Sequence, residues 1–311
     1  MGDGAEMKNG KKILAVTGLT GKSGIVFADL LGKEGLTKEY TIRAAVRTSS
    51  KTEALRAALP QAELCVGDLE DKAYLQRLTG DADVVFHIAG IGKSLPLVRA
   101  ALESGVKRLI LVHTTGIYSK YKAAGESYRK IDAEVTSLCE EHGAGLTILR
   151  PTMIYGTVGD RNVIQFIKMV DKLNPMPVVN HADYFLQPVH AEDLGHAYLG
   201  VMSHLCETSG KDYILSGKDP VKLIDLFRIA ADELGVRRRY FSVPFPIAYI
   251  GAWGLCLLSL RKVDMREKVQ RLCESRAYPH DDAVRDFGYE PMPFEEGLRR
   301  EVRDYLQIKN G

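Results

Sequence analysis

The sequence predicts an α/β protein built on a doubly wound parallel sheet, followed by a smaller and mostly helical C-terminal region. Short apolar runs typical of buried strands alternate with segments of helical periodicity through the first half of the chain. This alternation favours a parallel sheet with helices on both faces. The first apolar run ends in a glycine-rich loop that leads into a helical pattern. The expected strands cover residues 13–16, 40–46, 62–66, 83–88 and 109–113.

The loop after the first strand has the spacing of a dinucleotide-binding turn. Its glycines stand at positions 18, 21 and 24, between an apolar strand and an apolar helical pattern. Gly18 allows a tight turn, Gly21 lets the backbone approach a pyrophosphate, and Gly24 lets the helix pack closely on the strand. The N–H groups at the start of that helix attract phosphate oxygens. We therefore expect a Rossmann-type cofactor site that contains Gly18, Thr20, Gly21, Lys22, Ser23 and Gly24.

The same loop contains Gly21-Lys22-Ser23, which resembles the end of the phosphate-binding loop of nucleoside triphosphatases. That loop requires another glycine five residues before its Gly-Lys pair. Val16, a strand residue, occupies this position. The sequence therefore excludes the triphosphatase interpretation.

The end of the second expected strand indicates which dinucleotide is bound. An acidic side chain at this point would bind the ribose 2′-hydroxyl of NAD, whereas an arginine accommodates the 2′-phosphate of NADP. No Asp or Glu occurs between Tyr40 and Ser50, and Arg47 directly follows the strand. We expect NADP as the cofactor, with NAD as the less favoured alternative.

The composition excludes several classes of function. The chain has 311 residues, of which 45% are hydrophobic and 26% charged, and its formal net charge is +2. This charge is too small to indicate a nucleic-acid partner. The five cysteines are scattered, so we expect reduced thiols, a cytoplasmic location and no metal site. Residues 1–10 are polar and lack the apolar stretch of a signal peptide, and we expect them to form a disordered lead-in.

Further motifs follow the glycine loop in a fixed order along the chain. They are Gly67-Asp68-Leu69, residues 83–90 (DVVFHIAG), residues 149–156 (LRPTMIYG), residues 188–193 (PVHAED), Phe287-Gly288-Tyr289 and Glu296-Gly297. This ordered set resembles the short-chain dehydrogenase/reductase superfamily, in particular its extended or atypical branch, which is epimerase/dehydratase-like. The resemblance implies that Asp68 and Leu69 contact the adenine. It further implies that Ala89 and Gly90 pass close to the cofactor ribose, and that Pro151 belongs to the same site.

The resemblance also implies a catalytic set, which consists of a Ser or Thr after the fifth strand and a Tyr-x-x-x-Lys pair on the next helix. In such a pair the tyrosine is the acid/base, and the lysine holds the nicotinamide ribose and lowers the tyrosine pKa. Thr114 falls at the hydroxyl position when counted back from Tyr118, and Thr115 is its near alternative. Lys130 matches the family lysine by its distance from the motifs that follow.

The tyrosine expected four residues before Lys130 is replaced by Glu126. Tyr128 is two residues from the lysine, and residues two apart point to different sides of a helix. Tyr128 also continues an apolar stripe, so we expect it to pack inward. A literal Tyr-x-x-x-Lys connects Tyr118 with Lys122 in the segment before the helix.

Three interpretations of this departure stay open. Tyr118 or Tyr121 could transfer the proton from the loop, or the carboxylate of Glu126 could replace the phenol. Alternatively, Glu126, Lys130 and Glu134 form a solvated ladder of charges four residues apart. The sequence therefore predicts cofactor binding more firmly than catalysis.

The C-terminal residues predict a substrate region that is interleaved with the cofactor domain. We expect residues 11–154 and 181–217 to form the dinucleotide-binding domain, and residues 155–180 and 218–308 to form the substrate region. A strand over residues 183–189 should return to the sheet, and Asp193 should lie in the first turn of the helix that follows.

Residues 240–260 carry no charge and lie between two basic runs, Arg237-Arg238-Arg239 and Arg261-Lys262. Their number reaches that of a transmembrane helix, but two prolines and two glycines argue against spanning. We expect a helix that lines an apolar substrate cleft, with peripheral attachment to a membrane surface as the alternative. Either case favours a partly lipophilic substrate.

The sequence thus predicts an NADP-dependent oxidoreductase or epimerase/dehydratase-like enzyme that moves hydride to or from a carbonyl carbon of a small molecule. Thr114 would position the substrate oxygen, Lys130 would hold the ribose, and Tyr118 or Tyr121 would donate the proton. A catalytically silent NADP-binding sensor or assembly protein is the main alternative, and a lipid-modifying enzyme at a membrane surface is a third. We expect no nucleic-acid partner, and the sequence leaves a homodimer open.

Overall fold

The computed structural model describes residues 10–310, apart from residues 122, 158, 161 and 260–263. The main sheet consists of β1 (Lys12–Thr17), β2 (Tyr40–Val46), β3 (Glu63–Val66), β4 (Val84–His87), β5 (Arg108–Val112), β6 (Gly145–Pro151) and β11 (Lys211–Leu215). The helices that connect its first six strands are α1 (Lys22–Lys33), α2 (Leu36–Glu39), α3 (Glu53–Ala58), α4 (Lys72–Thr79), η1 (Ile91–Lys93), α5 (Ser94–Glu103), η2 (Thr115–Tyr118) and α6 (Gly125–Glu141).

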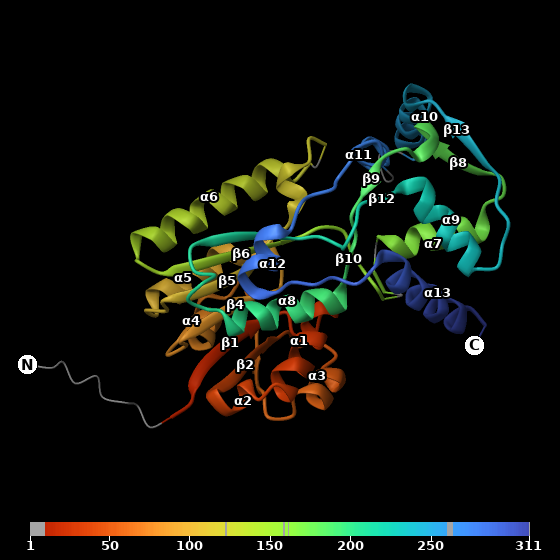
Figure 1. Ribbon diagram of the computed structural model, residues 1–311. Coiled ribbons are helices and arrows are strands. Elements are labelled where there is room, and N and C mark those ends of the chain that lie inside the picture. Colours follow the sequence, from red (N-terminus) through yellow and green to blue (C-terminus); the bar gives the residue numbers. More distant parts are fainter. Residues whose placement is uncertain (1–9, 122, 158, 161, 260–263, 311) are drawn as a thin grey trace, which may run out of the picture. The chain divides into compact units, whose positions relative to one another are not determined.

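The strand order of the main sheet is β11-β6-β5-β4-β1-β2-β3. Five of these strands, β6, β5, β4, β1 and β2, are labelled in Figure 1. β1 pairs in parallel with both β2 and β4, β2 pairs in parallel with β3, and β4 with β5. The chain therefore builds the sheet outward from β1 in one direction and then from β4 in the other. Because parallel crossovers are right-handed, this reversal puts the connecting helices on opposite faces. The predicted doubly wound α/β fold is confirmed.

The chain divides into two compact units, the first of which extends to Leu111 and includes Glu134–Thr147. Within this unit α1 packs on α3, and α4 packs on α5. The strand β1 is apolar and fully buried from Leu14 to Val16. The ring of Phe27 on α1 lies 5.0 Å from the ring of Phe86 on β4, and both are buried. This contact holds the first helix against the sheet, next to the glycine loop.

The second unit consists of Val112–Ala133 and the chain from Ile148 onward. Its strands outside the main sheet are β7 (Ile154–Tyr155), β8 (Met176–Val179), β9 (Phe185–Leu186), β10 (Val189–His190), β12 (Val221–Lys222) and β13 (Tyr240–Val243). Its further helices are α7 (Val163–Lys172), η3 (Asn180–Ala182), α8 (Ala191–Ser203), α9 (Leu223–Glu233), α10 (Phe245–Leu258), α11 (Arg266–Leu272), α12 (Asp281–Phe287) and α13 (Phe294–Asn310). The C-terminal part is therefore mostly helical, as predicted.

An apolar core joins α7, α9 and α13 in the second unit. The strand expected over residues 183–189 is wrong, because two short strands form there instead. β9 pairs with β12 and β10 pairs with β7, outside the main sheet. Pro188 separates them and has no N–H group for a continuous ladder. The predicted domain boundaries (11–154 with 181–217, and 155–180 with 218–308) stay a prediction.

The charge-free segment folds into a strand and a helix. Residues 240–243 form β13, which pairs with β8, and the helix α10 begins only after Pro244. Within the described residues, none of the helices combines the length and apolar character that crossing a bilayer requires.

Candidate functional site

The glycine loop between β1 and α1 is sterically tight at its three glycines. Gly18 has a φ of +85°, and the Gly21 N–H group donates a hydrogen bond of 2.9 Å to its carbonyl oxygen. A Cβ atom at Gly21 would lie 3.1 Å from that oxygen, and one at Gly24 would lie only 2.1 Å from it. At Gly18 a Cβ atom would lie 2.9 Å from the Ala89 nitrogen. The backbone of the loop therefore approaches itself and Ala89 too closely for side chains at Gly18 and Gly24.

The start of α1 suits an anion. Among the described residues no side chain caps this helix, and its first turn contains no acidic residue. The helix dipole therefore presents its positive end without local competition from a carboxylate. Thr20, Lys22 and Ser23 lie in or directly beside this turn. These features are those expected of a diphosphate cradle.

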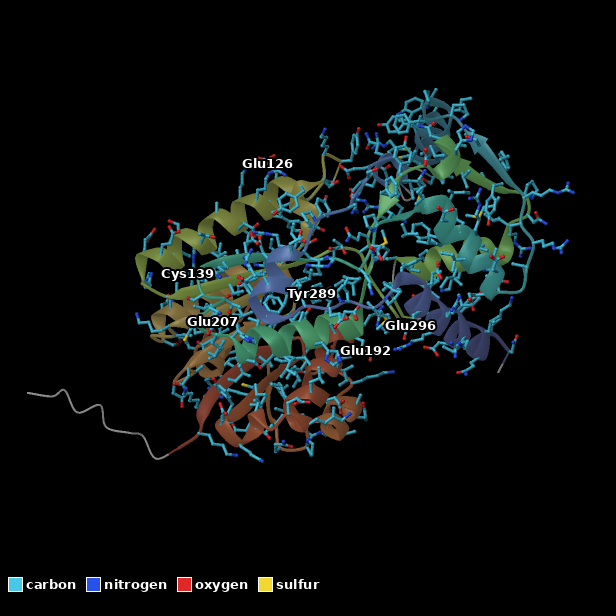
Figure 2. The ribbon with its side chains drawn as sticks, in the orientation of Figure 1. Glu126, Cys139, Glu192, Glu207, Tyr289 and Glu296 are labelled. Atoms are coloured by element: carbon cyan, nitrogen blue, oxygen red, sulfur yellow. The ribbon has the colours of Figure 1, made fainter. Side chains whose placement is uncertain are left out.

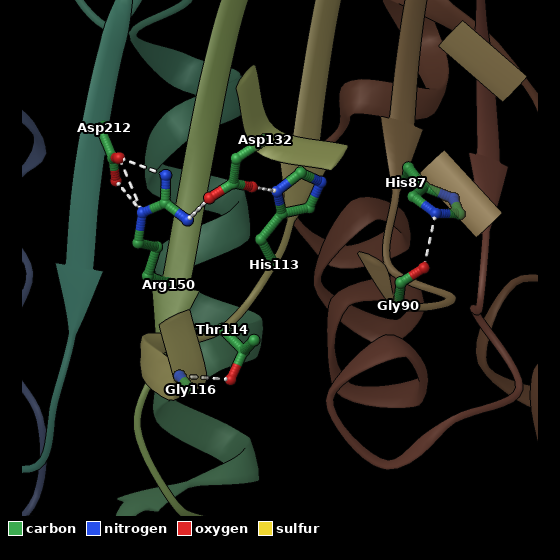
Figure 3. A network of polar contacts seen from close by, with 8 residues as sticks. All are labelled: His87, Gly90, His113, Thr114, Gly116, Asp132, Arg150 and Asp212. Carbon is green, nitrogen blue, oxygen red and sulfur yellow. Dashed lines mark hydrogen bonds and ion pairs between the residues drawn. The ribbon is translucent and has the colours of Figure 1, made fainter. Parts of the chain in front are cut away.

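His87 connects the glycine loop with the end of β4. Its Nδ1 atom lies 2.7 Å from the Thr17 hydroxyl, and its Nε2 atom lies 3.0 Å from the Gly90 carbonyl oxygen (Figure 3). Because a carbonyl oxygen only accepts, Nε2 carries the proton and Nδ1 accepts from Thr17. The Thr17 oxygen in turn accepts the Ala89 N–H group at 3.3 Å. This chain of bonds fixes the backbone of Ala89 and Gly90, where the ribose was expected.

The other predicted residues of the first unit also follow strand ends. Arg47 follows β2 and is exposed, and its N–H group donates to the Ser50 hydroxyl at 3.1 Å. Asp68 and Leu69 follow β3, and Asp68 accepts the Glu70 N–H group at 3.0 Å. Since β1 to β4 are parallel, these residues share one edge of the sheet with the glycine loop.

The remaining predicted residues belong to the second unit, and there the structure separates the two threonines. Thr114 caps η2, since its hydroxyl oxygen accepts the Gly116 N–H group at 3.0 Å (Figure 3). Its own O–H is left to donate to a ligand. Thr115 is buried, and its hydroxyl donates to the Pro151 carbonyl oxygen at 3.2 Å. Of the two, Thr114 is the one suited to contact a substrate.

Two tyrosines of the same segment are accessible. Tyr118 and Tyr121 are each more than one third exposed, and the ring of Tyr118 lies 5.6 Å from that of Tyr278. Partial burial raises the pKa of Tyr118, which the charge of Arg150 offsets only in part. The phenol is therefore protonated at neutral pH. Lys122, the lysine of the literal Tyr-x-x-x-Lys motif, lies outside the described residues.

Lys130 lies on α6 and pairs with Glu126, at 2.8 Å between Nζ and Oε1. The two side chains are 75% and 73% exposed, and Glu126 is labelled on α6 in Figure 2. Glu134 does not extend this ladder, because it pairs with Arg99. The solvated Glu126–Lys130 pair is thus confirmed, whereas the three-membered ladder is wrong. The assignment of Lys130 to the ribose stays a prediction.

An ionic network connects His113, Asp132, Arg150 and Asp212 (Figure 3). His113 Nδ1 bonds one carboxylate oxygen of Asp132, and Arg150 donates to the other at 2.7 Å. Arg150 also donates from Nε to Asp212 at 2.7 Å. Burial alone would raise the pKa of Asp132, but the bonds from His113 and Arg150 outweigh it and lower that pKa. The carboxylate therefore stays ionised.

This network joins the elements that carry the predicted catalytic residues. His113 directly precedes Thr114, and Asp132 follows Lys130 by two residues on α6. Asp132 is not among the site residues predicted from the sequence. The sequence feature that could have indicated it is a carboxylate on the apolar face of α6, where Val135 and Cys139 follow at helical spacing and are buried. A charge on an apolar helix face predicts a buried partner.

Two arginines that follow α10 have buried Nε atoms without a hydrogen-bond partner among the described residues. They are Arg271 at the end of α11 and Arg276 a few residues later. Burial lowers the pKa of Arg276 to about 10, and the charge of Arg271 adds to this effect. Glu274 between them bonds the Ser119 hydroxyl and the Lys120 N–H group instead, at 2.6 and 2.8 Å. Arg271 also pairs with Glu267 at 3.8 Å through another guanidinium nitrogen. A buried donor without an acceptor is costly, so the two Nε–H groups suit an anionic group.

Comparison with known proteins decides the family. A family model described as NAD(P)H-binding matches residues 18–174, which is just over half of the 311 residues. The chain belongs to this family. The match begins at the first glycine of the loop and extends past Pro151, and it gives the cofactor class as NAD(P).

Curated relatives of this NAD(P)H-binding protein include dehydrogenases and reductases. It is 21% identical to 3beta-hydroxysteroid-dehydrogenase/decarboxylase isoform 2 of Arabidopsis thaliana, over 78% of this chain and 52% of that protein. It is 28% identical to NADH dehydrogenase [ubiquinone] 1 alpha subcomplex subunit 9 of the same plant, over 63% of this chain and 46% of the relative. A third relative is 2-alkyl-3-oxoalkanoate reductase of Stenotrophomonas maltophilia, at 24% identity over 75% of this chain and 84% of the relative. The chain spans about half the length of the first two.

Solved structures confirm the fold. The UDP-glucose 4-epimerase of Thermotoga maritima has a TM-score of 0.70 at 20% identity, with 96% of this chain and 99% of that one covered. The dTDP-glucose 4,6-dehydratase of Streptomyces venezuelae, solved with NAD, has a TM-score of 0.71 at 17% identity, with 96% and 98% covered. These two likenesses show the fold. Together with the NAD(P)H-binding family match, they agree with the predicted resemblance to the short-chain dehydrogenase/reductases.

Proposed function

We propose that this NAD(P)H-binding protein is an NADP-dependent oxidoreductase or epimerase/dehydratase-like enzyme that acts at a carbonyl or alcohol carbon. The glycine loop carries this proposal, because its backbone comes so close to itself that no side chain fits at Gly24. The residues present fit a dinucleotide: the loop from Gly18 to Gly24 would hold the diphosphate, Asp68 and Leu69 the adenine, and Ala89–Gly90 the ribose. When bound, the nicotinamide accepts or supplies the hydride.

The preference for NADP rests on Arg47. Its guanidinium follows β2 in the exposed turn where a 2′-phosphate would lie. A guanidinium binds phosphate oxygens by charge-assisted hydrogen bonds. An acidic residue that would repel the phosphate does not occur between Tyr40 and Ser50.

The residues of the second unit would handle the substrate oxygen and its proton. The Thr114 hydroxyl accepts from Gly116, so its hydrogen is directed to an external acceptor such as a carbonyl oxygen. Tyr118 keeps its proton at neutral pH because its pKa is raised, and Tyr118 or the equally accessible Tyr121 would donate it to the alkoxide that forms. Lys130 would exchange its solvated partner Glu126 for the ribose hydroxyls, as its family counterpart does.

We further propose a substrate with an apolar part and an anionic group. The unpaired Nε atoms of Arg271 and Arg276 suit a phosphate or carboxylate. The helix α11, which contains Arg271, packs on the apolar α10. A steroid dehydrogenase and an alkyl-oxoalkanoate reductase among the relatives support an apolar part.

The test is NADPH consumption against a panel of carbonyl compounds, with and without an anionic group. We expect turnover of at least one anionic, partly apolar carbonyl compound. Thr114→Ala should lower kcat about 100-fold, the cost of losing one donor to a developing oxyanion, and leave the Kd for NADPH unchanged. Thr136→Ala, on α6 outside the site, is the control. Normal turnover by Thr114→Ala would contradict the assignment.

A second candidate is a catalytically silent NADP-binding sensor or assembly protein. The solvated pair of Glu126 and Lys130 favours it, because a family enzyme has a tyrosine where Glu126 stands. A relative that is a subunit of NADH dehydrogenase adds support. Tight NADPH binding without turnover of any compound in the panel would favour this candidate over the enzyme.

A further inference from the structure

The helix α10 is apolar on nearly all sides, although it lies at the protein surface. Its buried residues are Ala252 and Cys256, which are four residues apart and mark one narrow stripe. Phe245, Ala248, Tyr249 and Gly254 are half-buried. The other side chains face outward, with Ile250 65%, Trp253 50% and Leu258 86% exposed. A globular protein ordinarily turns such side chains inward.

The exposed apolar side chains of the protein are concentrated on this helix. Six of the fourteen large apolar side chains that are exposed in the described part of the chain belong to α10. They are Ile247, Ile250, Trp253, Leu255, Leu257 and Leu258. A contiguous apolar surface of this kind marks an interaction site.

The length of α10 favours a position in a bilayer interface. Fourteen residues extend about 21 Å at 1.5 Å per residue, whereas the hydrocarbon core is about 30 Å thick. A helix of this length lies along the headgroup boundary instead of crossing it. Trp253, the single tryptophan of the chain, is the side chain type that is enriched at that boundary.

Basic residues outnumber acidic ones on both sides of this helix in the sequence. The described part of residues 237–271 contains six basic residues, Arg237, Arg238, Arg239, Arg266, Lys268 and Arg271, and two acidic ones, Asp264 and Glu267. The whole chain has a net charge of only +2. The helix α11, which packs on α10, carries three of the basic residues. Two copies of such a surface would repel each other, whereas anionic lipid headgroups attract it.

We propose that α10 is a membrane-docking helix that inserts its apolar side chains into the headgroup boundary of an anionic bilayer. Lys268 of α11 binds a lipid phosphate, because it is exposed and forms no ion pair with the described residues, whereas Arg266 pairs with Asp264 and Arg271 with Glu267. The proposal is independent of turnover, because docking requires neither the cofactor nor the catalytic residues.

The full-length protein tests this directly, since Trp253 is the only tryptophan. Vesicles of phosphatidylcholine with phosphatidylglycerol should shift its emission to shorter wavelength and carry the protein upward in flotation. Vesicles of pure phosphatidylcholine should bind several-fold more weakly, and Lys268→Gln should weaken binding to the anionic vesicles about fivefold, the effect of one basic residue near the surface. An unchanged emission spectrum with both vesicles would overturn the proposal.

Matched variants distinguish docking through α10 from nonspecific adsorption of the protein to vesicles. Ile250→Asp on α10 should abolish flotation, whereas Ile308→Asp on α13, where the side chain is 68% exposed, should leave it unchanged. Both side chains are solvent-exposed, so we expect unaltered thermal unfolding. Equal losses in the two variants would contradict the proposal. So would a wild-type dimer in light scattering that Ile250→Asp converts to a monomer without any vesicle binding, because α10 would then be an interface between two copies.

Discussion

The replacement of Gly24 by alanine tests the glycine loop at its tightest point. The added Cβ atom would lie 2.1 Å from the Gly18 oxygen and 2.8 Å from the Leu19 Cα atom. Both neighbours are backbone atoms, so no side-chain rotation relieves the contact. An ordinary contact of about 3.4 Å needs a movement of about 1.3 Å (3.4 minus 2.1), and overpacking of this kind costs about 1–3 kcal/mol of stability.

The same movement should weaken cofactor binding. Phosphate oxygens would be held by N–H groups of this turn, and each charge-assisted hydrogen bond is worth about 1.5–3 kcal/mol. The loss of one such bond raises the Kd about 10- to 150-fold. Titration calorimetry with NADPH measures this, next to thermal unfolding of the free protein. Gly251→Ala on α10, where no described atom would lie within 4 Å of the new Cβ, is the matched control. A Gly24→Ala protein that binds NADPH like the wild type would refute the role of the loop.

Three further predictions concern charged residues. Asp132→Ala should lower the free energy of unfolding in urea by about 3–5 kcal/mol, the cost of breaking a buried ion pair. Asp212→Ala should lower it by less, because the Asp212 side chain is 44% exposed. Equal losses in the two variants would contradict this. Burial raises the pKa of Asp193 to about 7 from 3.8, so its ionisation costs the folded state stability as the pH rises from about 4 to about 7. The free energy of unfolding of Asp193→Asn should therefore exceed that of the wild type increasingly across that window. The difference should be close to zero below pH 4 and about 4 kcal/mol above pH 7, since 7 minus 3.8 is 3.2 and each pKa unit is worth about 1.36 kcal/mol. A difference that does not change with pH would contradict this. Arg47→Ser should raise the Kd for NADPH about tenfold and leave the Kd for NADH unchanged, as one exposed charge-assisted bond implies; calorimetry that shows equal changes would exclude a 2′-phosphate contact.

The fold could be predicted because its signals are local. The first strands are apolar runs, each followed by a helical pattern, and β2 has the predicted bounds of residues 40–46. The glycine loop required no knowledge of distant residues either, because its steric limits follow from Gly18, Gly21 and Gly24 themselves. A fold can be predicted from its sequence where local patterns agree with the overall structure in this way.

The contacts between distant segments could not be predicted in the same way. His87 bonds to Thr17, seventy residues earlier in the chain, and Asp132 meets Arg150 and His113. No local sequence pattern around any of these residues indicates its distant partner. The strand expected over residues 183–189 failed for the opposite reason, because a local apolar pattern was interrupted by Pro188.

The most direct test of the account is a crystal structure of the protein grown with NADPH. We expect the diphosphate against the backbone between Gly18 and Gly24, and the adenine beside Asp68. NADPH bound elsewhere on the protein, with the glycine loop unchanged and without ligand, would contradict it.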